Sequence, residues 1–245
     1  MQKTLILIPS RLSATRLPGK PLLKINDLSI ISHVVKKAEE SAIGEVYVAT
    51  EDNEIMEDIK KNGGKAILTS KNHKTGSDRI FECFEKLNLQ NVDYIINLQG
   101  DEPNIDIDDL KNLYQLVKKN KSDLGTLAAK IDDKLVLSNK NIVKVVTETQ
   151  LNKDNFPFAK DFKRNIDNNE NNIFHHIGIY IYKTEILKKI VKLEQSNNEI
   201  KNRLEQLRAM DNGIKINVAL AKFTPIGVDT MEDYLALKKI MEYKS

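Results

Sequence analysis

The stretch that decides the fold is Thr4-Leu-Ile-Leu-Ile-Pro-Ser-Arg-Leu-Ser-Ala-Thr-Arg-Leu-Pro-Gly-Lys-Pro-Leu22. A short apolar run ends at Pro9 and passes directly into a loop that holds Arg11, Arg16 and Lys20 beside a glycine. Three positive charges within ten residues, with no acid among them, favour an anionic ligand over an ordinary solvated turn. We therefore predict a buried first strand that delivers a cationic loop to a polyphosphate. A triphosphate would bring a metal ion, so acidic ligands are expected elsewhere in the chain.

Strand-like and helix-like segments alternate after this stretch. Predicted strands cover residues 4–8, 45–49, 65–68 and 93–98, and predicted helices cover residues 30–41, 53–61, 77–87 and 106–119. Continuous apolar runs with helices between them are typical of a parallel sheet covered on both faces. The sequence predicts an α/β fold whose first half is a Rossmann-like layer, with a mostly parallel central sheet flanked by helices.

The second half is less regular. Predicted strands cover residues 124–131, 142–147, 177–182 and 215–221, and predicted helices cover 184–193, 199–211 and 231–243. The segment 154–172 is rich in Asn, Asp and Lys, and a connection of this length is usually a lid, a binding loop or a disordered insert. No repeat or linker divides the sequence, so we expect a single domain.

Length and composition exclude several classes of protein. The 245 residues, 40% hydrophobic and 30% charged, describe one soluble globular domain. A net charge of +3, evenly spread, argues against a nucleic-acid partner. The N-terminal apolar run is shorter than the ~7–15 residues of a signal-peptide core, and nothing approaches the ~20 residues of a membrane span. We expect a cytoplasmic protein with no membrane partner, in which the single cysteine, Cys83, is a buried thiol.

Two acidic segments are candidates for a metal site. Asp101 follows a predicted strand directly, at the sheet edge where α/β proteins bind ligands, and Gly100 lets the backbone come close to a ligand. Asp229 precedes the last predicted helix, where it or Thr230 is also suited to be the N-cap. Mg²⁺ prefers one or two carboxylates together with substrate phosphates. Asp101 could equally cap the following turn.

Three further patterns are weaker. The segment His73–Arg79 lies at a loop-to-helix junction, where backbone amides suit an anion and Ser77 suits an N-cap. His175 and His176 are expected at the mouth of a strand, and no further Cys or His has the spacing of a zinc site. Glu205 and Arg208, three residues apart on a predicted helix, could be only a surface pair.

Seven motifs together resemble the CMP-Kdo synthetase (3-deoxy-manno-octulosonate cytidylyltransferase) family. In order, they are Ser10-Arg11 with Leu17-Pro-Gly-Lys-Pro-Leu22, Thr75-Gly-Ser-Asp-Arg79, Leu98-Gln-Gly-Asp-Glu-Pro103, Asn141-Ile-Val-Lys-Val-Val146, His176-Ile-Gly-Ile-Tyr180, Leu204-Glu-Gln-Leu-Arg208 and Val228-Asp-Thr-Met-Glu-Asp233. The resemblance runs from about residue 5 to about residue 237.

The resemblance implies a fold, an activity and a site. It implies a nucleotide-diphospho-sugar transferase fold, a homodimer, and Mg²⁺-dependent transfer of CMP from CTP to the eight-carbon acid sugar Kdo. It implies three parts: residues 1–125 for the nucleotide, 126–225 for the sugar and the dimer, and 226–245 as a returning metal-ligand loop and helix. The implied residues are Arg11, Lys20, Asp101 and Asp229 for catalysis, with both aspartates on the metal; Ser10, Arg11, Arg16, Lys20, Gly76, Ser77, Arg79 and Gln99 for the nucleotide; and His176, Tyr180, Glu205 and Gln206 for the sugar.

Departures from the family pattern leave the substrate open. Ser10 stands where the family usually has Ala, and Ala159-Lys160 stands where Ser-Arg is expected. His175 replaces an Arg that often precedes the pocket histidine. Lys is not a neutral substitute for an Arg that grips a carboxylate, so CMP transfer to 8-amino-Kdo or a sialic-type acid is an alternative. A non-catalytic nucleotide-binding module and a hexose-1-phosphate nucleotidyltransferase also stay open as functions.

Overall fold

The computed structural model describes residues 3–13, 16–166 and 170–243. Residues 14–15 of the cationic loop and 167–169 of the polar segment therefore lie outside the described residues. The chain forms two compact units, the first made of residues 1–108 and 225–245 and the second of residues 109–224.

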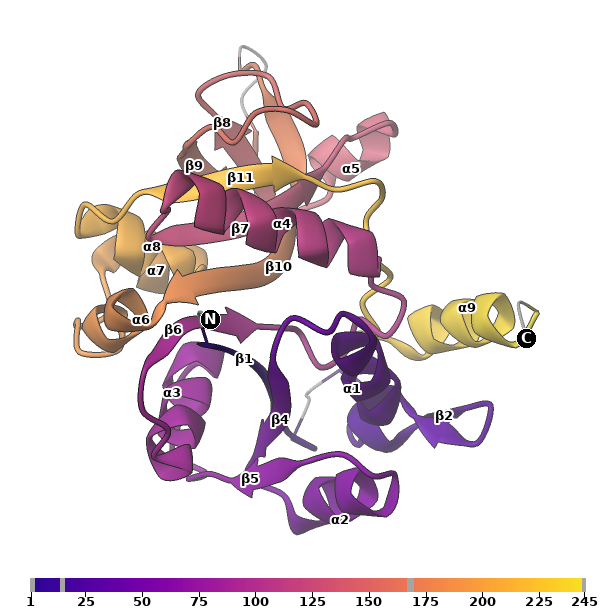
Figure 1. The fold of residues 1–245 in the computed structure, drawn as a ribbon. Coiled ribbons are helices and arrows are strands. Elements are labelled where there is room, and N and C mark those ends of the chain that lie inside the picture. Colours follow the sequence, from indigo (N-terminus) through magenta and orange to yellow (C-terminus); the bar gives the residue numbers. More distant parts are fainter. Residues whose placement is uncertain (1–2, 14–15, 167–169, 244–245) are drawn as a thin grey trace. The chain divides into compact units, whose positions relative to one another are not determined.

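The first unit is built on a parallel four-stranded sheet (Figure 1). Its strands lie in the order β6-β1-β4-β5, with bounds β1 Lys3–Ser10, β4 Glu45–Thr50, β5 Ala66–Leu68 and β6 Val92–Asn97. The apolar run of β1, residues 5–8, is fully buried because helices cover both faces of the sheet. The parallel arrangement expected for the first half is confirmed.

Helices α1 (Ile30–Glu40), α2 (Asn53–Lys61) and α3 (Gly76–Leu87) connect these strands. The chain runs from β1 to β4 and β5 in one direction and then returns to β6 on the other side of β1. Because parallel crossovers are right-handed, this reversal places α1 and α2 on one face of the sheet and α3 on the other, as Figure 1 shows. The carboxyl ends of β1 and β6 therefore flank the point where the strand order reverses, which is where such sheets bind ligands.

The last segment of the chain completes the first unit. Helix α9 (Met231–Glu242) packs beside a small hairpin formed by β2 (Lys24–Ile25) and β3 (Leu28–Ser29), which follows the 3-10 turn η1 (Lys20–Leu22). Leu237 of α9 joins Ile25 and Val228 in an apolar cluster, and the Tyr234 hydroxyl donates to the Lys24 carbonyl at 2.6 Å. This packing fixes the start of α9, and with it the segment that precedes the helix.

The second unit has a mixed sheet in the order β11-β7-β10-β8-β9, in which only β11 and β7 are parallel. Its bounds are α4 Ile107–Asn120, which enters the unit at residue 109, β7 Leu124–Ala129, α5 Lys134–Ser138, β8 Lys144–Thr147, β9 Ala159–Lys163, β10 Ile173–Lys183, α6 Thr184–Ile190, α7 Asn197–Asn202, α8 Gln206–Asp211 and β11 Ile216–Leu220. The two edges of this sheet approach each other: the Val218 amide of β11 donates to the carbonyl of Pro157, just before β9, at 2.9 Å.

Three expectations for the second half are wrong. The polar segment 154–172 contains strand β9, whose Phe162 is buried against the sheet. Strand β10 begins at Ile173, so His175 and His176 lie within it and not at its mouth. The helix expected over residues 199–211 is two helices, because Arg203 adopts a left-handed conformation with φ 54° and ends α7.

Candidate active site

The cationic loop begins where β1 ends. The loop closes on itself, since the Gly19 amide donates to the Leu12 carbonyl at 3.0 Å. Gly19 has φ 74°, a left-handed conformation that suits glycine, and it is the N-cap of η1. Pro21, the second residue of η1, fits the first turn of a helical segment because it lacks an N–H. Lys20 is thereby placed at the carboxyl end of β1, as the sequence predicts.

Asp101 follows β6 at the neighbouring strand end. The turn before it passes close to β1, so that a Cβ on Gly100 would lie 2.9 Å from the Pro9 carbonyl oxygen. Only glycine fits this approach without a shift of the backbone. Asp229 reaches the same place from the far end of the sequence, because the Val228 amide donates to the Asp101 carbonyl at 3.0 Å.

The start of α9 holds Asp229 in position. Thr230 is the N-cap, and Asp233 completes a capping box with it. The Asp233 carboxylate also accepts the Asp229 amide at 3.1 Å. Thr230, and not Asp229, therefore caps the helix, which leaves the Asp229 carboxylate available to the site.

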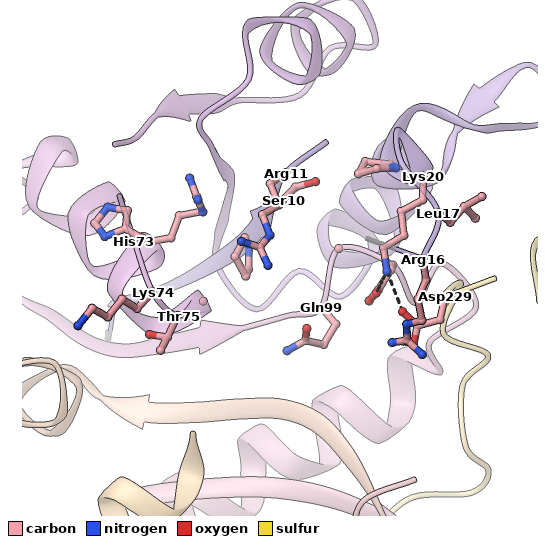
Figure 2. A pocket seen from close by; sticks show the side chains of 16 residues that line it. Ser10, Arg11, Arg16, Leu17, Lys20, His73, Lys74, Thr75, Gln99 and Asp229 are labelled. Carbon is pink, nitrogen blue, oxygen red and sulfur yellow. Dashed lines mark hydrogen bonds and ion pairs between the residues drawn. The ribbon is translucent and has the colours of Figure 1, made fainter. Parts of the chain in front are cut away.

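Cations and carboxylates come together at the ends of these two strands. The Lys20 ammonium lies 2.5 Å from Asp101 Oδ2 and 3.1 Å from Asp229 Oδ1, and the Arg16 guanidinium lies 2.8 Å from Asp229 Oδ2 (Figure 2). Burial lowers the pKa of Lys20, but the two carboxylates outweigh burial and hold that pKa above its usual value. The lysine is therefore charged at neutral pH.

Glu102 does not add a third negative charge to the group. Burial raises the pKa of Glu102 to about 8, and repulsion from Asp101 and Asp229 acts in the same direction, while Lys20 opposes it. Its Oε2 atom is buried and has no hydrogen-bond partner among the described residues. Glu102 is therefore largely protonated at neutral pH, and the negative charge of the site belongs to Asp101 and Asp229.

These groups line a cavity of about 340 Å³ in the first unit. Its lining residues are Pro9, Ser10, Arg11, Arg16, Leu17, Lys20, Pro21, His73, Lys74, Thr75, Gly76, Arg79, Gln99, Gly100, Asp101 and Asp229. In Figure 2, Lys20, Arg16 and Asp229 lie at one end, His73 and Thr75 lie at the other, and Gln99 lies between. The two ends therefore differ in chemistry.

The His73 end is formed by the loop before α3. Thr75 is the N-cap of α3 and accepts the Asp78 amide at 3.2 Å, so Ser77 is not the cap. Ser77 is buried inside the first turn and does not line the cavity. Arg79 does line it, but its guanidinium is bound to Glu51 and to the Thr69 hydroxyl.

The sequence reasoning missed His73, Lys74 and Thr75 as lining residues. Their signal was present, because they lie at the loop-to-helix junction that the sequence marks as suited to an anion.

The His73 ring is bound to the Glu82 carboxylate, which also accepts the Ser70 amide at 2.9 Å and the Lys86 ammonium at 2.7 Å. These bonds hold the Glu82 pKa at about 2, although burial alone would raise it.

The residues expected to bind the sugar belong to the second unit and form a separate group. The His176 ring packs at 4.9 Å from the ring of Phe162 and 5.5 Å from that of Tyr180, and its Nε2 lies 3.1 Å from the Thr126 hydroxyl. Burial lowers the pKa of His176 to about 3, so the ring is neutral at neutral pH. Burial also raises the pKa of Tyr180, and Tyr182 and Glu205 add to the rise. His176, Tyr180 and Glu205 are thus close together, and Gln206 begins α8 beside them.

Arg208 does not lie at the surface. It is buried, and it binds Glu199 of α7 with two hydrogen bonds, at 2.8 and 2.6 Å. The break at Arg203 explains this contact, because it folds α7 back beside α8.

The two neighbouring histidines of β10 each lie close to a threonine hydroxyl. His175 Nδ1 lies 3.4 Å from the Thr224 hydroxyl, and His176 Nε2 lies near Thr126. Among the residues that the structure describes, no group of three or more His, Cys, Asp or Glu is placed to hold a metal ion. No helix in the described ranges is long and apolar enough to span a membrane.

Comparisons with known proteins identify the family of the chain. A family model described as Cytidylyltransferase matches residues 5–216. A 3-deoxy-manno-octulosonate cytidylyltransferase of Thermodesulfovibrio yellowstonii is 42% identical, over 97% of this chain and 98% of the relative. The enzyme of that name from Afipia carboxidovorans is 40% identical, over 97% and 96%.

Solved structures show the same fold. A CMP:2-keto-3-deoxy-manno-octonic acid synthetase complexed with CTP has a TM-score of 0.90 at 34% identity and covers 100% of both chains. A UDP-glucose pyrophosphorylase complexed with UDP-glucose has a TM-score of 0.73 at 17% identity over 100% of both chains, and so shares the fold alone. The expected mixed α/β fold, with a mostly parallel central sheet flanked by helices, is confirmed. On this sequence identity and coverage, the chain belongs to the 3-deoxy-manno-octulosonate cytidylyltransferase family of nucleotidyltransferases.

Proposed function

We propose that the chain transfers the cytidylyl group of CTP to 3-deoxy-D-manno-octulosonate (Kdo), forming CMP-Kdo and pyrophosphate for lipopolysaccharide biosynthesis. The observation that carries the proposal is the meeting of Lys20 with Asp101 and Asp229 in a cavity whose cationic loop suits a triphosphate. In the reaction, the anomeric hydroxyl of the sugar attacks the α-phosphorus, and pyrophosphate leaves in line.

Asp101 and Asp229 fit a magnesium ion. One oxygen of each carboxylate already accepts from the same ammonium group, so a positive charge can lie between them. Two carboxylates are the share that a protein usually gives to Mg²⁺ when phosphate and water complete its ligands. When bound, Mg²⁺ neutralises phosphate charge and lowers the pKa of the attacking hydroxyl.

The cations of the loop bind and orient the triphosphate in this proposal. Phosphoryl transfer leaves little covalent chemistry to the protein, so catalysis depends on positioning and on charge stabilisation. Lys20 and Arg16 exchange a carboxylate for a phosphate when CTP binds, and exposed Arg11 also lines the cavity. Lys20 and Arg11 then stabilise the charge on the transferring and leaving phosphates.

The opposite end of the cavity receives the nucleoside. The first residue of α3, Gly76, lies at a helix N-terminus, where backbone amides are available to an acceptor. Glu51 holds the Arg79 guanidinium in the wall at this end. Ser10 and Gln99 line the cavity between the nucleoside and the phosphates.

The sugar contacts His176, Tyr180, Glu205 and Gln206. The Tyr180 hydroxyl has no hydrogen-bond partner among the described residues, and a sugar hydroxyl would satisfy it. Lys160 on β9 is exposed where the family has an arginine. A monodentate lysine grips a carboxylate less specifically than arginine does, so CMP transfer to 8-amino-Kdo or a sialic-type acid stays the second candidate.

We also propose that the protein works as a cytoplasmic homodimer, since that is what membership of the family implies. Light scattering of the purified protein measures the oligomeric state. A mass near that of one chain, 27.9 kDa, would contradict the dimer.

Pyrophosphate release tests the reaction and the substrate together. CTP and Mg²⁺ are supplied with Kdo, 8-amino-Kdo or a sialic acid in separate assays, with the Asp229→Asn variant as a matched control. Release with Kdo alone supports the proposal, and release only with another acid keeps the reaction but changes the substrate. Binding of CTP without release from any of the three would instead support a non-catalytic nucleotide-binding module.

A further inference from the structure

One acidic side chain outside the cavity is bound to the cationic loop. The Asp52 carboxylate accepts the backbone amide of Leu12 at 2.7 Å. Asp52 is the second residue after β4, and Leu12 is the second residue after β1, whose last residue, Ser10, is paired with Thr50 in the parallel register. Beyond the point where both strands end, this hydrogen bond therefore joins the two chain segments through the Asp52 side chain.

Asp52 makes this bond in place of a local one. It is the N-cap of α2, a position where aspartate normally accepts an amide from the first turn of its own helix. Here its side chain makes no capping hydrogen bond. The Asp52 amide instead donates to the Thr50 hydroxyl at 3.1 Å, which fixes the backbone that presents the carboxylate.

Leu12 is the base of the loop. Its carbonyl accepts the Gly19 amide at 3.0 Å and closes the loop, while its amide is held by Asp52. Arg11 precedes Leu12, and Lys20 follows Gly19, so a displacement of Leu12 moves both cations. Asp52 itself does not line the cavity.

We propose that Asp52 is a positioning residue of the nucleotide site, whose carboxylate fixes the loop cations through the amide of Leu12. This inference rests on the proposed function for its ligand, CTP. A carboxylate near an anion site would by its charge alone weaken the binding of a triphosphate. The positioning role therefore predicts an effect opposite in sign to the charge effect.

Two substitutions separate the roles. Asp52→Ala removes the acceptor, and Asp52→Asn keeps an oxygen that can accept the Leu12 amide while it removes the charge. Asp93→Ala is the matched control, because the Asp93 carboxylate accepts the Lys3 amide at 2.8 Å, at the other end of β1 and away from the cavity. The measurements are CTP affinity with Mg²⁺ by calorimetry, hydrogen exchange of the Leu12 amide, and thermal unfolding.

We expect Asp52→Ala to weaken CTP binding about tenfold, equal to about 1.4 kcal/mol, and to speed exchange at Leu12. Asp52→Asn should bind CTP within about threefold of the original protein, and Asp93→Ala should not change the affinity. Tighter or unchanged binding by Asp52→Ala would overturn the proposal, as would an equal loss in both Asp52 variants. If the unsubstituted protein bound no CTP, the proposed function would fail, whereas unchanged Leu12 exchange in Asp52→Ala would refute the positioning role alone.

Discussion

Substitution of Lys20 by methionine tests the charge arrangement of the site. The change keeps most of the side-chain volume and removes the ammonium that lies 2.5 Å from Asp101 Oδ2 and 3.1 Å from Asp229 Oδ1. Without substrate, the two carboxylates then lose their shared cation, and Arg16 still pairs with Asp229. With substrate, the triphosphate loses one cation of its loop.

Lys20→Met is expected to affect the stability of the fold and the rate of the reaction by different amounts. The side chains of Lys20, Asp101 and Asp229 are 13%, 29% and 43% exposed. Loss of one partner from a fully buried pair costs about 3–5 kcal/mol, and exposed pairs contribute about 0.2–1 kcal/mol. We expect an intermediate loss of about 1–2 kcal/mol in unfolding free energy. Turnover should fall by about 10²–10³-fold, as when single electrostatic donors are removed elsewhere.

Steady-state pyrophosphate release and urea unfolding measure the two effects on the same preparations. Lys37→Met is the matched control, because Lys37 pairs with Glu40 on the surface of α1, away from the cavity. It should change unfolding by less than about 0.5 kcal/mol and leave turnover intact. Because the Lys20 pKa is raised, its stabilising effect should persist through neutral pH and disappear only as pH rises through that pKa. Turnover of Lys20→Met within twofold of the original enzyme would refute the assignment of Lys20 to phosphate.

Three further outcomes are expected. The pKa of Glu82 is about 2 against an ordinary 4.5, so the ionised Glu82 carboxylate stabilises the fold above pH 4.5 and loses this effect as pH falls toward 2. The Glu82→Gln variant should therefore be less stable than the original protein at pH 7, by on the order of 2 kcal/mol. Urea unfolding at pH 3 should show a smaller difference between the two proteins. Glu199→Gln leaves the Arg208 guanidinium buried beside a neutral partner, and a loss of about 3–5 kcal/mol is expected; equal urea midpoints would contradict this. His176 has a pKa of about 3, so its ring resonances should not titrate by NMR between pH 5 and 8, and a midpoint near 6.5 would show that the ring is accessible to water.

Local patterns in the first half were sufficient to predict the four strands of its parallel sheet and the helices between them, but not the β2–β3 hairpin. The apolar run of β1 is a buried strand, and the glycine pair at residues 63–64 separates α2 from β5, both as expected. Asp101 and Asp229 were both predicted as candidates, because each lies where a regular element begins or ends, and the structure brings both to Lys20. Their meeting depends on the Val228–Asp101 hydrogen bond, which no local pattern encodes.

The misses have physical causes in long-range contacts. Nothing in the local sequence shows that Arg203 adopts a positive φ, since arginine rarely does so. The buried partner of Arg208 became visible only when that break placed Glu199 beside it. Strand β9 is short and polar apart from Phe162, and its pairing with β8 defines it more than its composition does.

The hydrogen bond from the Ile226 amide to the Asn104 side chain, at 2.9 Å, joins positions 122 residues apart. It holds the segment that precedes α9 beside the segment that carries Asp101. Proteins are made from the N-terminus at about 5–20 residues per second, and domains generally fold as units during synthesis. Asp101 and the cationic loop therefore leave the ribosome well before Asp229 has been made. A growing chain can form the parallel sheet early, yet it gains both carboxylates of the proposed metal site only when translation has passed residue 229. The candidate site is in this sense assembled only after residue 229 has been made, and a chain terminated before that residue would retain the loop cations without the pair.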